Sequence, residues 1–338
     1  MEIGIKETVD IDVCCFYNQK YDVLPTPDSN NETRLLKAKH GLKILGDPYR
    51  KVCRCCGKKE PEVSFKKIAH AFPEAIGNKA LATYYECDVC NDFFGRTIEN
   101  DYCNYFSLFH SVMVKSGKGG KRECKFKVPC EKRTANCSNS CVRIEYINNN
   151  PCIYRCENVS EKYVELKDNC LKISKKTGKC CLIAVFKTLV KMAITVMPEK
   201  EIHTFSNVIK WILEEEHNNY YISKPLLIRY QMIPGFNVTR YPHFVLYRRK
   251  SGVLDVPYML FQLTYSCFSL LIEVPNDYEA KCISNLKFAT LPFPYVPFYT
   301  SEEGVWNMSE TGNSEGDYQR INLSFDGVNV LHDNNMLD

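Results

Sequence analysis

Four cysteines in the first third of the chain have the spacing of metal ligands. Cys53 and Cys56 form one CxxC pair, and Cys87 and Cys90 form a second. Two CxxC pairs of this kind are typical of a tetrahedral zinc site, in which each thiolate lies about 2.3 Å from the ion. Such a site holds two separate segments of a small unit side by side. The spacing therefore predicts a structural zinc site, with unrelated free cysteines as the alternative and Cys55 as a bystander.

A single histidine, His70, lies between the two cysteine pairs. It follows a short β-like run and is followed by a Pro-Glu turn and a Gly-Asn turn, in the stretch KKIAHAFPEAIGNKALATYYECDVCNDFFG. A structural zinc site explains the cysteines but not this histidine. Because imidazole ordinarily titrates at about pH 6.5, it suits proton abstraction near neutral pH. The functional interpretation is a catalytic base, and the alternative is a histidine whose hydrogen bonds are satisfied under the turn.

The elements that position these residues follow from the surrounding pattern. Two short β segments precede the second cysteine pair, and residues 96–116 have apolar side chains at helical spacing. We predict an α+β protein in three parts, which are an N-terminal lead-in (1–47), a zinc-bound unit (48–120) and a β-rich mixed α+β C-terminal region (121–338).

The remaining elements are also expected from local patterns. These expectations are a strand-like run at 11–17, a helical stretch at 33–45, an antiparallel meander at 123–176, helices at 179–197 and 199–217, strands through the last third, and a mobile acidic loop at 301–317. The most apolar run, 180–198, contains Lys187 and Lys191. A membrane span needs about 20 largely uncharged residues. This run therefore favours a buried amphipathic helix.

Composition narrows the class of protein. The chain has 338 residues, of which 45% are hydrophobic and 25% charged, as in folded soluble proteins. It shows no export signal, so its 19 cysteines indicate cytoplasmic thiols, some of them bound to metal. Cys137 with Cys141, and Cys152 with Cys156, have CxxxC spacing. A second zinc site formed by these four cysteines is therefore a possibility.

Positive charge is concentrated in one segment, although the net charge is only +4. Residues 115–133, KSGKGGKRECKFKVPCEKR, hold eight Lys or Arg against two Glu. Such a segment can follow a phosphate backbone, and a solvated loop is an equally good interpretation. Further along, Arg240, Tyr241, Arg248 and Arg249 could stack on or pair with a nucleotide, or form an exposed face of a sheet.

The order of these motifs resembles one enzyme family. CxxC, then K-x-x-A-H-x-x-P-E-x-x-G-N, then C-x-x-C-N-x-x-F-G-x-x-I-E is similar to the HNH endonucleases with a zinc-clamped ββα-metal fold. The nearest branch has the signature E/A-H-I-I-P-E-x-L-G, and its relatives include bacterial anti-phage defence nucleases fused to cyclic-nucleotide sensors. The resemblance covers roughly Lys51 to Tyr105. No other part of the chain resembles a domain that we can name.

The resemblance implies a metal-dependent endonuclease that hydrolyses phosphodiester bonds in DNA. His70 would be the general base, Asn91 would bind a catalytic Mg²⁺ or Mn²⁺, and Asn78 is the nearest amide to orient the base. Lys66 and Lys67 precede the histidine and would contact backbone phosphate, or be ordinary solvated lysines. Expected partners are nucleic acid, a second copy of the chain, and a regulatory ligand or protein at the C-terminal region, with no membrane.

Two departures from the family pattern leave alternatives open. Ala69 stands where many HNH proteins have an acidic residue, and the middle Asn of the family motif falls near Ala82 and Thr83. The carboxylates that remain for a metal are those of Glu74, Asp92 and Glu99. The alternatives are a zinc-stabilised binding module that has lost catalysis, which Ala69 favours, and an HNH-type nuclease that cleaves RNA.

Overall fold

The computed structural model describes residues 11–25, 42–111, 115–116, 122–128, 140–147, 150–155, 160–218, 224–233, 239–277, 288–294, 302–310, 318–324 and 329–332. In this part of the chain, no helix is both long enough and apolar enough to cross a membrane.

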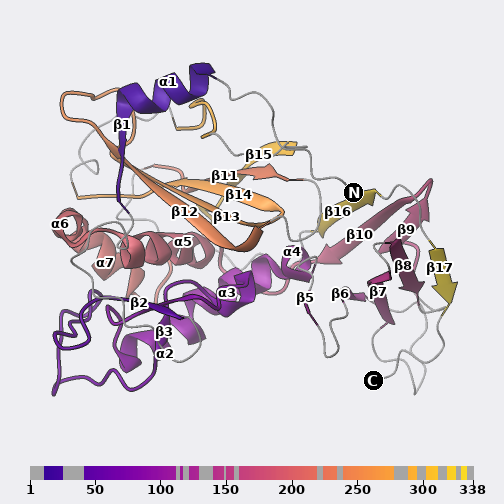
Figure 1. Ribbon diagram of the computed structural model, residues 1–338, viewed down its shortest axis with the longest axis horizontal. Helices are drawn as coiled ribbons and strands as arrows, with labels where there is room; N and C mark the ends of the chain where they lie inside the picture. The colour runs from indigo at the N-terminus through magenta and orange to yellow at the C-terminus, as the bar shows by residue number, and fades with distance from the viewer. Residues whose placement is uncertain are drawn as a thin grey trace.

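A six-stranded antiparallel sheet forms the centre of the larger part of the molecule (Figure 1). Its strand order is β1-β12-β13-β14-β11-β15. The bounds are β1 Tyr21–Val23, β11 Leu227–Met232, β12 Thr239–Arg249, β13 Met259–Ser266, β14 Phe268–Glu273 and β15 Glu302–Asn307. Every residue of β13 is buried. A strand buried along its whole length must be covered on both faces of the sheet.

Helices cover the two faces of this sheet. One face packs against α5 (Leu182–Val196), all of whose residues are buried, together with α6 (Glu199–Ile202), η2 (His203–Phe205) and α7 (Ser206–Ile212). The other face packs against α1 (Ile11–Lys20), as Figure 1 shows. The buried helix expected at 180–198 is therefore confirmed as α5. The second helix, expected at 199–217, is instead three short helical segments that end at Ile212.

The N-terminal segment differs from its expectation. Residues 11–17 read as strand-like but lie in α1. The Tyr17 ring packs 5.0 Å from that of Tyr247, and the chain then enters edge strand β1, where Tyr21 pairs with Arg249 of β12. Packing against the sheet overrides the local strand propensity here.

The cysteine and histidine motifs lie in a small layer beside α5. Its elements are β2 (Lys43–Leu45), β3 (Ala69–His70), η1 (Glu74–Ile76), β4 (Leu81–Thr83), α2 (Asp88–Arg96), α3 (Ile98–Tyr105) and α4 (Ser107–Ser111). The strand order is β2-β4-β3, with β3 antiparallel to β4 and β2 parallel to it. Residues 43–45 of the stretch expected to be helical are thus a strand. The single helix expected from residue 96 is two helices separated at Phe106.

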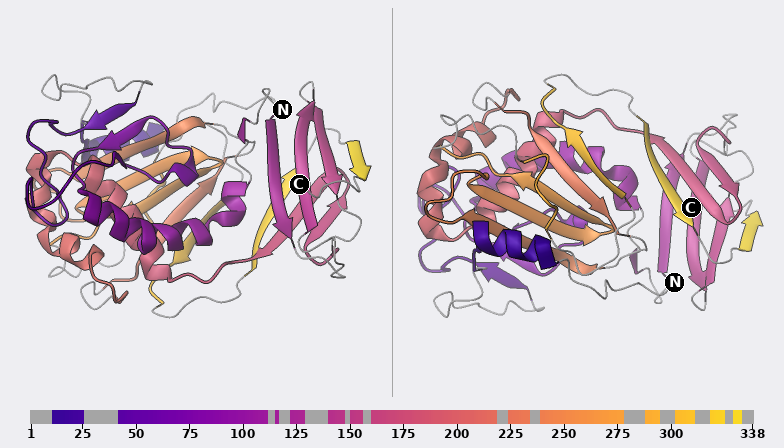
Figure 2. Two further views of the ribbon diagram at one scale, coloured as in Figure 1. Left: turned by 90° about the horizontal axis from the view of Figure 1, so that it is seen from below. Right: turned by 90° about the horizontal axis from the view of Figure 1, so that it is seen from above.

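Two further sheets lie at the opposite end of the molecule from the cysteine motifs (Figure 2). One contains β9 (Val164–Lys167), β10 (Cys170–Lys176) and β16 (Tyr318–Ser324). The other contains β5 (Lys115–Ser116), β6 (Arg122–Val128), β7 (Ser140–Ile147), β8 (Asn150–Arg155) and β17 (Asn329–His332). The antiparallel strands expected at 123–176 are confirmed, although they divide between two sheets. Part of the basic segment is strand β5 and strand β6 rather than loop.

Strand β15 corrects another expectation. Residues 301–317 read as a mobile acidic loop, but Glu302–Asn307 pair with β11. The Trp306 ring stacks on Tyr230 at 3.9 Å. A Cβ at Gly304 would lie 2.6 Å from the ring carbon that bears the Tyr230 hydroxyl, so this close approach requires glycine. Residues 311–317 lie outside the described ranges.

Candidate metal centre and active site

The structure brings the four predicted zinc ligands together. The Sγ atoms of Cys53, Cys56, Cys87 and Cys90 all lie within 4.8 Å of one another, and those of Cys56 and Cys87 are 3.8 Å apart. A tetrahedral zinc–thiolate site places its sulfurs about 3.8 Å apart, so the cluster fits zinc. Hydrogen bonds from the Cys55 and Cys90 thiols lower the pKa of Cys53. Burial raises the pKa of Cys87 to about 11, and the hydrogen bond with Cys53 raises the pKa of Cys90, so the lowered pKa belongs to Cys53 and a bound zinc ion would supply the charge that deprotonates the others.

A tight turn forms the first half of this cluster. The Cys53 N–H donates to the Lys58 carbonyl at 2.9 Å, and the Gly57 N–H donates to the Cys53 carbonyl at 2.8 Å. Gly57 has φ +72°, a left-handed conformation that glycine adopts without strain. The chain thus reverses between Cys53 and Lys58, which places Cys56 on the same side as Cys53.

The start of helix α2 forms the second half. Cys87 is the N-cap residue of α2, and Cys90 lies in its first turn, where the side chain is buried. Unpaired N–H groups at a helix N-terminus carry partial positive charge, which stabilises nearby thiolates. The local sequence therefore supplies the spacing of the second pair, and the Cys90 backbone N–H at the helix start offsets part of the burial that raises the pKa of Cys87.

Asp88 fixes the chain that leads to the histidine. Its carboxylate accepts the backbone N–H of Lys66 at 3.0 Å and of Lys67 at 2.9 Å, and it also accepts the Ser64 hydroxyl. The Lys67 ammonium pairs with Asp92 at 2.8 Å, and this hydrogen bond raises the pKa of Lys67. Both side chains of that pair are more than half exposed, so breaking the ion pair costs little free energy. The Lys66 side chain is exposed.

His70 is the second residue of strand β3, where it pairs with Ala82 of β4. Its side chain is 31% exposed, and its Nε2 lies 3.0 Å from the Glu74 Oε1. Its Nδ1 is buried and has no hydrogen-bond partner among the described residues. Ala69, the position that is acidic in many HNH proteins, is buried. The imidazole is thus held at the edge of the layer by one carboxylate.

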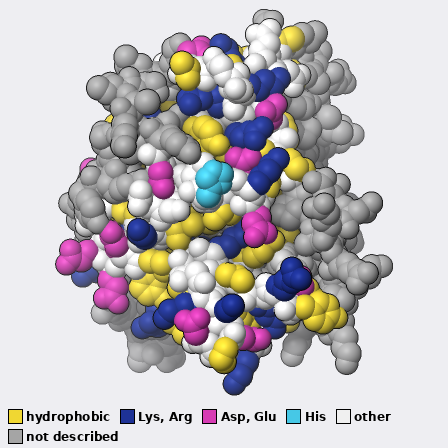
Figure 3. All heavy atoms as spheres, turned by 90° about the vertical axis from the view of Figure 1, so that its left-hand side faces the viewer, with side chains coloured by type: hydrophobic (Ala, Val, Ile, Leu, Met, Phe, Trp, Pro, Cys, Tyr) yellow, Lys and Arg dark blue, Asp and Glu magenta, His cyan; other side chains and the backbone are white. Residues whose placement is uncertain are grey.

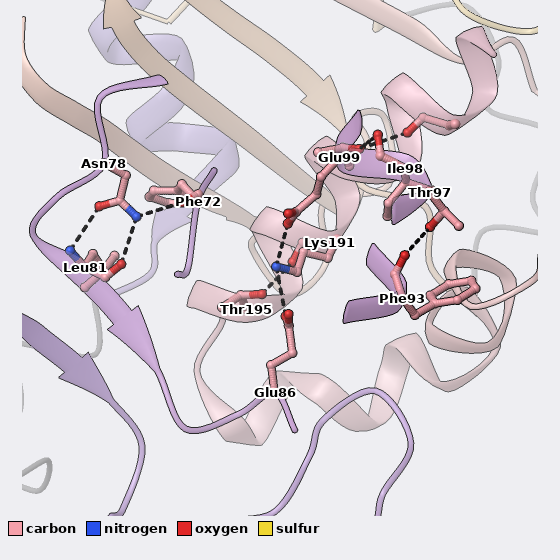
Figure 4. A network of polar contacts seen from close by, with 12 residues as sticks. Phe72, Asn78, Leu81, Glu86, Phe93, Thr97, Ile98, Glu99, Lys191 and Thr195 are labelled. Carbon is pink, nitrogen blue, oxygen red and sulfur yellow. Dashed lines mark hydrogen bonds and ion pairs between the residues drawn. The ribbon is translucent and has the colours of Figure 1, made fainter. Parts of the chain in front are cut away.

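Asn78 closes the loop that follows the histidine (Figure 4). It is buried, and its amide nitrogen donates to the carbonyls of Phe72 at 2.9 Å and Leu81 at 2.8 Å. Its oxygen accepts the N–H groups of Ala80 at 3.3 Å and Leu81 at 3.0 Å. The side chain therefore bonds the backbone on both sides of the loop and makes no bond to the His70 ring. Its influence on the histidine acts through the loop.

Phe72 anchors the same loop on the six-stranded sheet. Its ring lies 5.4 Å from that of Phe244 in β12 and 6.5 Å from that of Phe261 in β13. The residue two positions after His70 is thus packed against strands of the C-terminal region. Sequence reasoning missed this contact because its partners lie far apart along the chain and each reads as ordinary core.

Arg54, inside the first cysteine pair, joins that turn to helix α5. Its guanidinium donates to the carbonyls of Ile194 at 3.0 Å, Thr195 at 3.2 Å and Met197 at 2.7 Å, and it lies 3.4 Å from the centre of the Tyr85 ring. These carbonyls include some of the last of α5, which have no partner within the helix. Arg54 therefore caps α5 from the cysteine turn.

A buried ion triad makes a second connection to α5 (Figure 4). The Lys191 ammonium lies 2.8 Å from Glu86 and 2.9 Å from Glu99. The side chains of Lys191 and Glu86 are each only 2% exposed, and burial raises the pKa of Glu86 to about 7. Glu99 was one of the carboxylates considered for the metal. Its ion pair with Lys191 commits it to the interior instead.

The residues expected to hold a catalytic ion are not gathered into a cluster like that of the cysteines. Among the described residues, the four cysteines form the only group of three or more His, Cys, Asp or Glu side chains with adjacent ligand atoms. Asn91 lies in the first half of α2, where its N–H donates to the Cys87 carbonyl, and no hydrogen bond joins its side chain to His70 within the described chain. Mg²⁺ often uses few protein ligands and keeps several waters or phosphate oxygens. The ligand role of Asn91 stays a prediction.

The second zinc site considered from the sequence falls largely outside the described residues. Cys137, Cys156 and the side chain of Cys141 are not among them. Cys152 is a buried free cysteine in β8. A second zinc site therefore stays a possibility of the sequence alone.

The surface at the end of the molecule near α6 and α7 carries both signs of charge (Figure 3). Lys and Arg side chains are interspersed there with Asp and Glu, and apolar side chains lie between them. An extended field of one sign, which would steer a polyanion over long distances, is not seen on this face.

Comparison with known proteins identifies one family. Searches of curated proteins and of solved structures find no match to the chain. A family model described as HNH endonuclease matches residues 53–107. The matched span begins at the first cysteine of the cluster, includes His70 and Asn78, and ends at the start of α4. The segment with the four clustered cysteines and His70 thus matches the HNH endonuclease family, as the order of its motifs predicted.

Proposed function

We propose that this protein is a metal-dependent HNH endonuclease that hydrolyses phosphodiester bonds in DNA, with His70 as the general base. The observation that carries the proposal is the position of His70 within the matched span. The imidazole is partly exposed on strand β3, while the residues around it, Ala69, Ala71 and Phe72, are buried. A solvent-accessible base on a rigid frame is what attack by water on a phosphate requires.

The chemistry assigned to His70 is one proton transfer. The imidazole takes a proton from water as the water oxygen bonds to phosphorus, and the bond from phosphorus to the leaving oxygen breaks. A divalent ion bound at the site would supply positive charge for the phosphorane and the leaving oxygen. Asn91, phosphate oxygens and water would hold that ion. Lys66 and Lys67, on the backbone fixed by Asp88, would contact the phosphate chain.

The four cysteines would hold a structural zinc in this scheme. They join the turn at Cys53 to the start of α2. Because Asp88 at that helix start also fixes the segment before His70, zinc would stabilise the base and the phosphate-binding lysines together.

Two alternatives remain from the sequence. A zinc-stabilised binding module without catalysis is favoured by Ala69 and by the lack of a second cluster of His, Cys, Asp or Glu in the described chain. An RNA-cleaving enzyme would share every contact named for the DNA nuclease. We propose DNA because it is the substrate that the resemblance to the HNH family implies. Cleavage assays with DNA and with RNA decide between the two substrates.

The proposed activity is tested by nicking of supercoiled plasmid. Purified full-length protein is incubated with Mg²⁺ or Mn²⁺, or with EDTA, beside a matched single-stranded RNA. We expect conversion of plasmid to the nicked or linear form with either metal and none with EDTA. Binding of plasmid without cleavage in all conditions would favour the binding module. Cleavage of RNA but not of plasmid would favour the RNA-cleaving nuclease.

The catalytic Mg²⁺ or Mn²⁺ should be removable from the protein without loss of the structural zinc. Thiolates prefer zinc, whereas amide and phosphate oxygens prefer harder ions. Dialysis against a mild chelator should therefore stop cleavage and leave the zinc bound. Adding Mg²⁺ or Mn²⁺ should then restore cleavage. Asn91→Ala should weaken this restoration and keep the zinc. Full cleavage by protein that contains zinc alone would contradict the proposal of two metal roles.

Loss of one zinc ligand should affect folding as well as activity. In small units, zinc binding and folding are coupled. We expect one zinc per chain in the purified protein by elemental analysis, and loss of zinc and solubility in Cys87→Ser. The exposed Cys15 of α1 provides a control, since Cys15→Ser should keep both. Freshly purified protein without zinc would remove the structural role proposed for the cluster.

The C-terminal region supplies less evidence of a ligand than its sequence suggested. Arg248 pairs with Asp22 at 2.9 Å and with Glu201 at 2.8 Å, and Arg249 donates to the Val256 carbonyl at 2.8 Å. Both arginines thus hold elements of the fold together. The Arg240 and Tyr241 side chains lie outside the described part of the chain. A regulatory ligand, a homodimer, a cytoplasmic location and a role in anti-phage defence stay predictions.

A further inference from the structure

We propose that Tyr49 and the cations near it bind a single-stranded stretch of the DNA substrate, with the Tyr49 ring stacked on a base. This inference names the form of the substrate and rests on the function proposed above. The Tyr49 side chain is 87% exposed, the largest exposed fraction among the large hydrophobic residues of the described chain. An exposed aromatic ring is a stacking platform for any base, because every base has a π face.

The turn that carries Tyr49 has a fixed backbone. The Tyr49 N–H donates to the Asp47 Oδ1 at 2.8 Å, and the Arg50 N–H donates to the Asp47 carbonyl at 3.3 Å. Gly46 precedes the turn with φ +97°, and a Cβ there would lie 3.1 Å from the Tyr85 ring. The chain therefore follows a path that favours glycine. Because the turn is already ordered, little backbone freedom is lost when the ring binds a base.

Four cations lie in the two chain segments next to this turn, and they are Arg50, Lys51, Lys58 and Lys59. A bridge between Val52 and Lys59 places the two segments side by side. Arg50, Lys58 and Lys59 are exposed, and among the described residues none of the four cations has a carboxylate partner. Cations without partners close to an exposed ring are the combination by which proteins bind single strands, since the cations neutralise phosphates while the ring stacks.

The turn lies at the end of the three-stranded sheet where β3 begins. Strand β2 runs parallel to β4 and β3 runs antiparallel to it, so Leu45 aligns with Thr83, which pairs with Ala69, the neighbour of His70. Because adjacent strands are about 4.8 Å apart, Leu45 is about 10 Å from Ala69, or about three nucleotides of a stacked strand. One DNA strand can therefore extend from His70 to the Tyr49 turn.

Stacking on Tyr49 requires a base with a free face. In a continuous duplex, both faces of each base are covered by its neighbours, and exposing one costs unstacking energy. A single strand offers such a face at a lower cost. The arrangement at Tyr49 therefore favours single-stranded DNA over a duplex of the same sequence.

The test measures binding separately from cleavage. Full-length, zinc-loaded protein that carries His70→Ala is titrated, without Mg²⁺ or Mn²⁺, with fluorescein-labelled single-stranded DNA and with the matching duplex. Adding Tyr49→Ala should raise the Kd for the single strand by about 5- to 100-fold and leave the Kd for the duplex unchanged. Tyr49→Phe keeps the ring and should keep the Kd. Leu254→Ala, at a 76% exposed position between β12 and β13, is the control and should change neither Kd.

The dependence of Kd on salt tests the cations. For a single strand, each phosphate contact contributes about 0.7 to the slope of log Kd against log salt concentration. Replacing Arg50, Lys58 and Lys59 together with glutamine should therefore lower the slope by about 2. Tyr49→Ala should leave the slope unchanged, because stacking releases no counterions. An unchanged slope in the triple variant would show that these cations do not contact phosphate.

The outcomes separate this inference from the proposed function. If Tyr49→Ala binds the single strand with the wild-type Kd while the wild type nicks plasmid, the function stands and the role of Tyr49 is wrong. If Tyr49→Ala weakens duplex binding as much as single-strand binding, the proposed preference for an unstacked base is wrong. If Tyr49 contributes to single-strand binding but the wild type cleaves nothing, the inference stands and the nuclease function fails. Because the ring is 87% exposed, zinc content and thermal midpoint should match the wild type in every Tyr49 variant.

Discussion

Replacing His70 with alanine should lower the rate of plasmid nicking by about 10²- to 10⁴-fold, the usual contribution of a general base. The loss should be in kcat, because a base interacts with the transition state much more than with bound substrate. Stability should change little, since the side chain is 31% exposed and its one partner, Glu74, is mostly in solvent. The measurement is the initial rate of nicking at saturating Mn²⁺, together with zinc content and plasmid affinity.

His203 provides the matched control for this variant. It lies in the short helix η2, is exposed, and bonds the Lys200 carbonyl of its own turn at 2.8 Å. His203→Ala should nick at the wild-type rate. Equal rates for wild type, His70→Ala and His203→Ala would show that His70 is not the base. Equal loss in both variants would point to a general effect on the fold.

Replacing Lys191 with methionine should destabilise the protein by about 3–5 kcal/mol, the cost of removing one partner from a buried ion pair. Methionine fills a similar volume but leaves the carboxylates of Glu86 and Glu99 without their cation, and Glu86 has almost no access to water. Denaturant unfolding of zinc-loaded protein measures the change. Because Glu86 precedes Cys87, one of the four clustered cysteines, and Glu99 lies in α3, we also expect weaker zinc retention.

Two further variants isolate the cause. Lys172 pairs with Glu165 between β10 and β9, where both side chains are 51% exposed, so Lys172→Met should cost less than about 1 kcal/mol. Neutralising both carboxylates beside the methionine, with Glu86→Gln and Glu99→Gln, should recover a large part of the loss. A Lys191→Met protein as stable as Lys172→Met would contradict the view that the triad is a buried charged unit.

Local motifs made the cysteine cluster predictable from the sequence. The cysteine pairs specify their own geometry, because a CxxC turn and a helix N-terminus each place two thiolates on one side. His70 was chosen as the candidate base by its position between them, and that role stays a prediction. The strands of the central sheet followed from runs of apolar and β-branched residues, and α5 from an apolar run interrupted by lysines.

Other features depend on partners distant in sequence, and no local pattern could supply them. Residues 11–17 have strand propensity, yet Tyr17 fixes them as helix by packing on Tyr247. Acidic β15 pairs along its length with distant β11, and Trp306 stacks on Tyr230 across that pair. Lys191 read as a charge that excludes a membrane span, and its actual role required knowledge of where Glu86 and Glu99 lie. Nothing in the local sequence marked Arg54, although it caps a helix about 140 positions away.

The contacts of Arg54, Phe72 and Lys191 bear on whether the matched segment can be moved into another chain. The family match covers residues 53–107, but these residues share one continuous hydrophobic core with α5 and the six-stranded sheet. A gene fusion that carried the matched span alone would separate the cysteine turn from the helix it caps, the histidine loop from the sheet beneath it, and two acids from their cation. In this chain the segment is therefore not a self-contained cassette. A recombinant chain that preserves its structure would also have to carry α5 and the strands that support it.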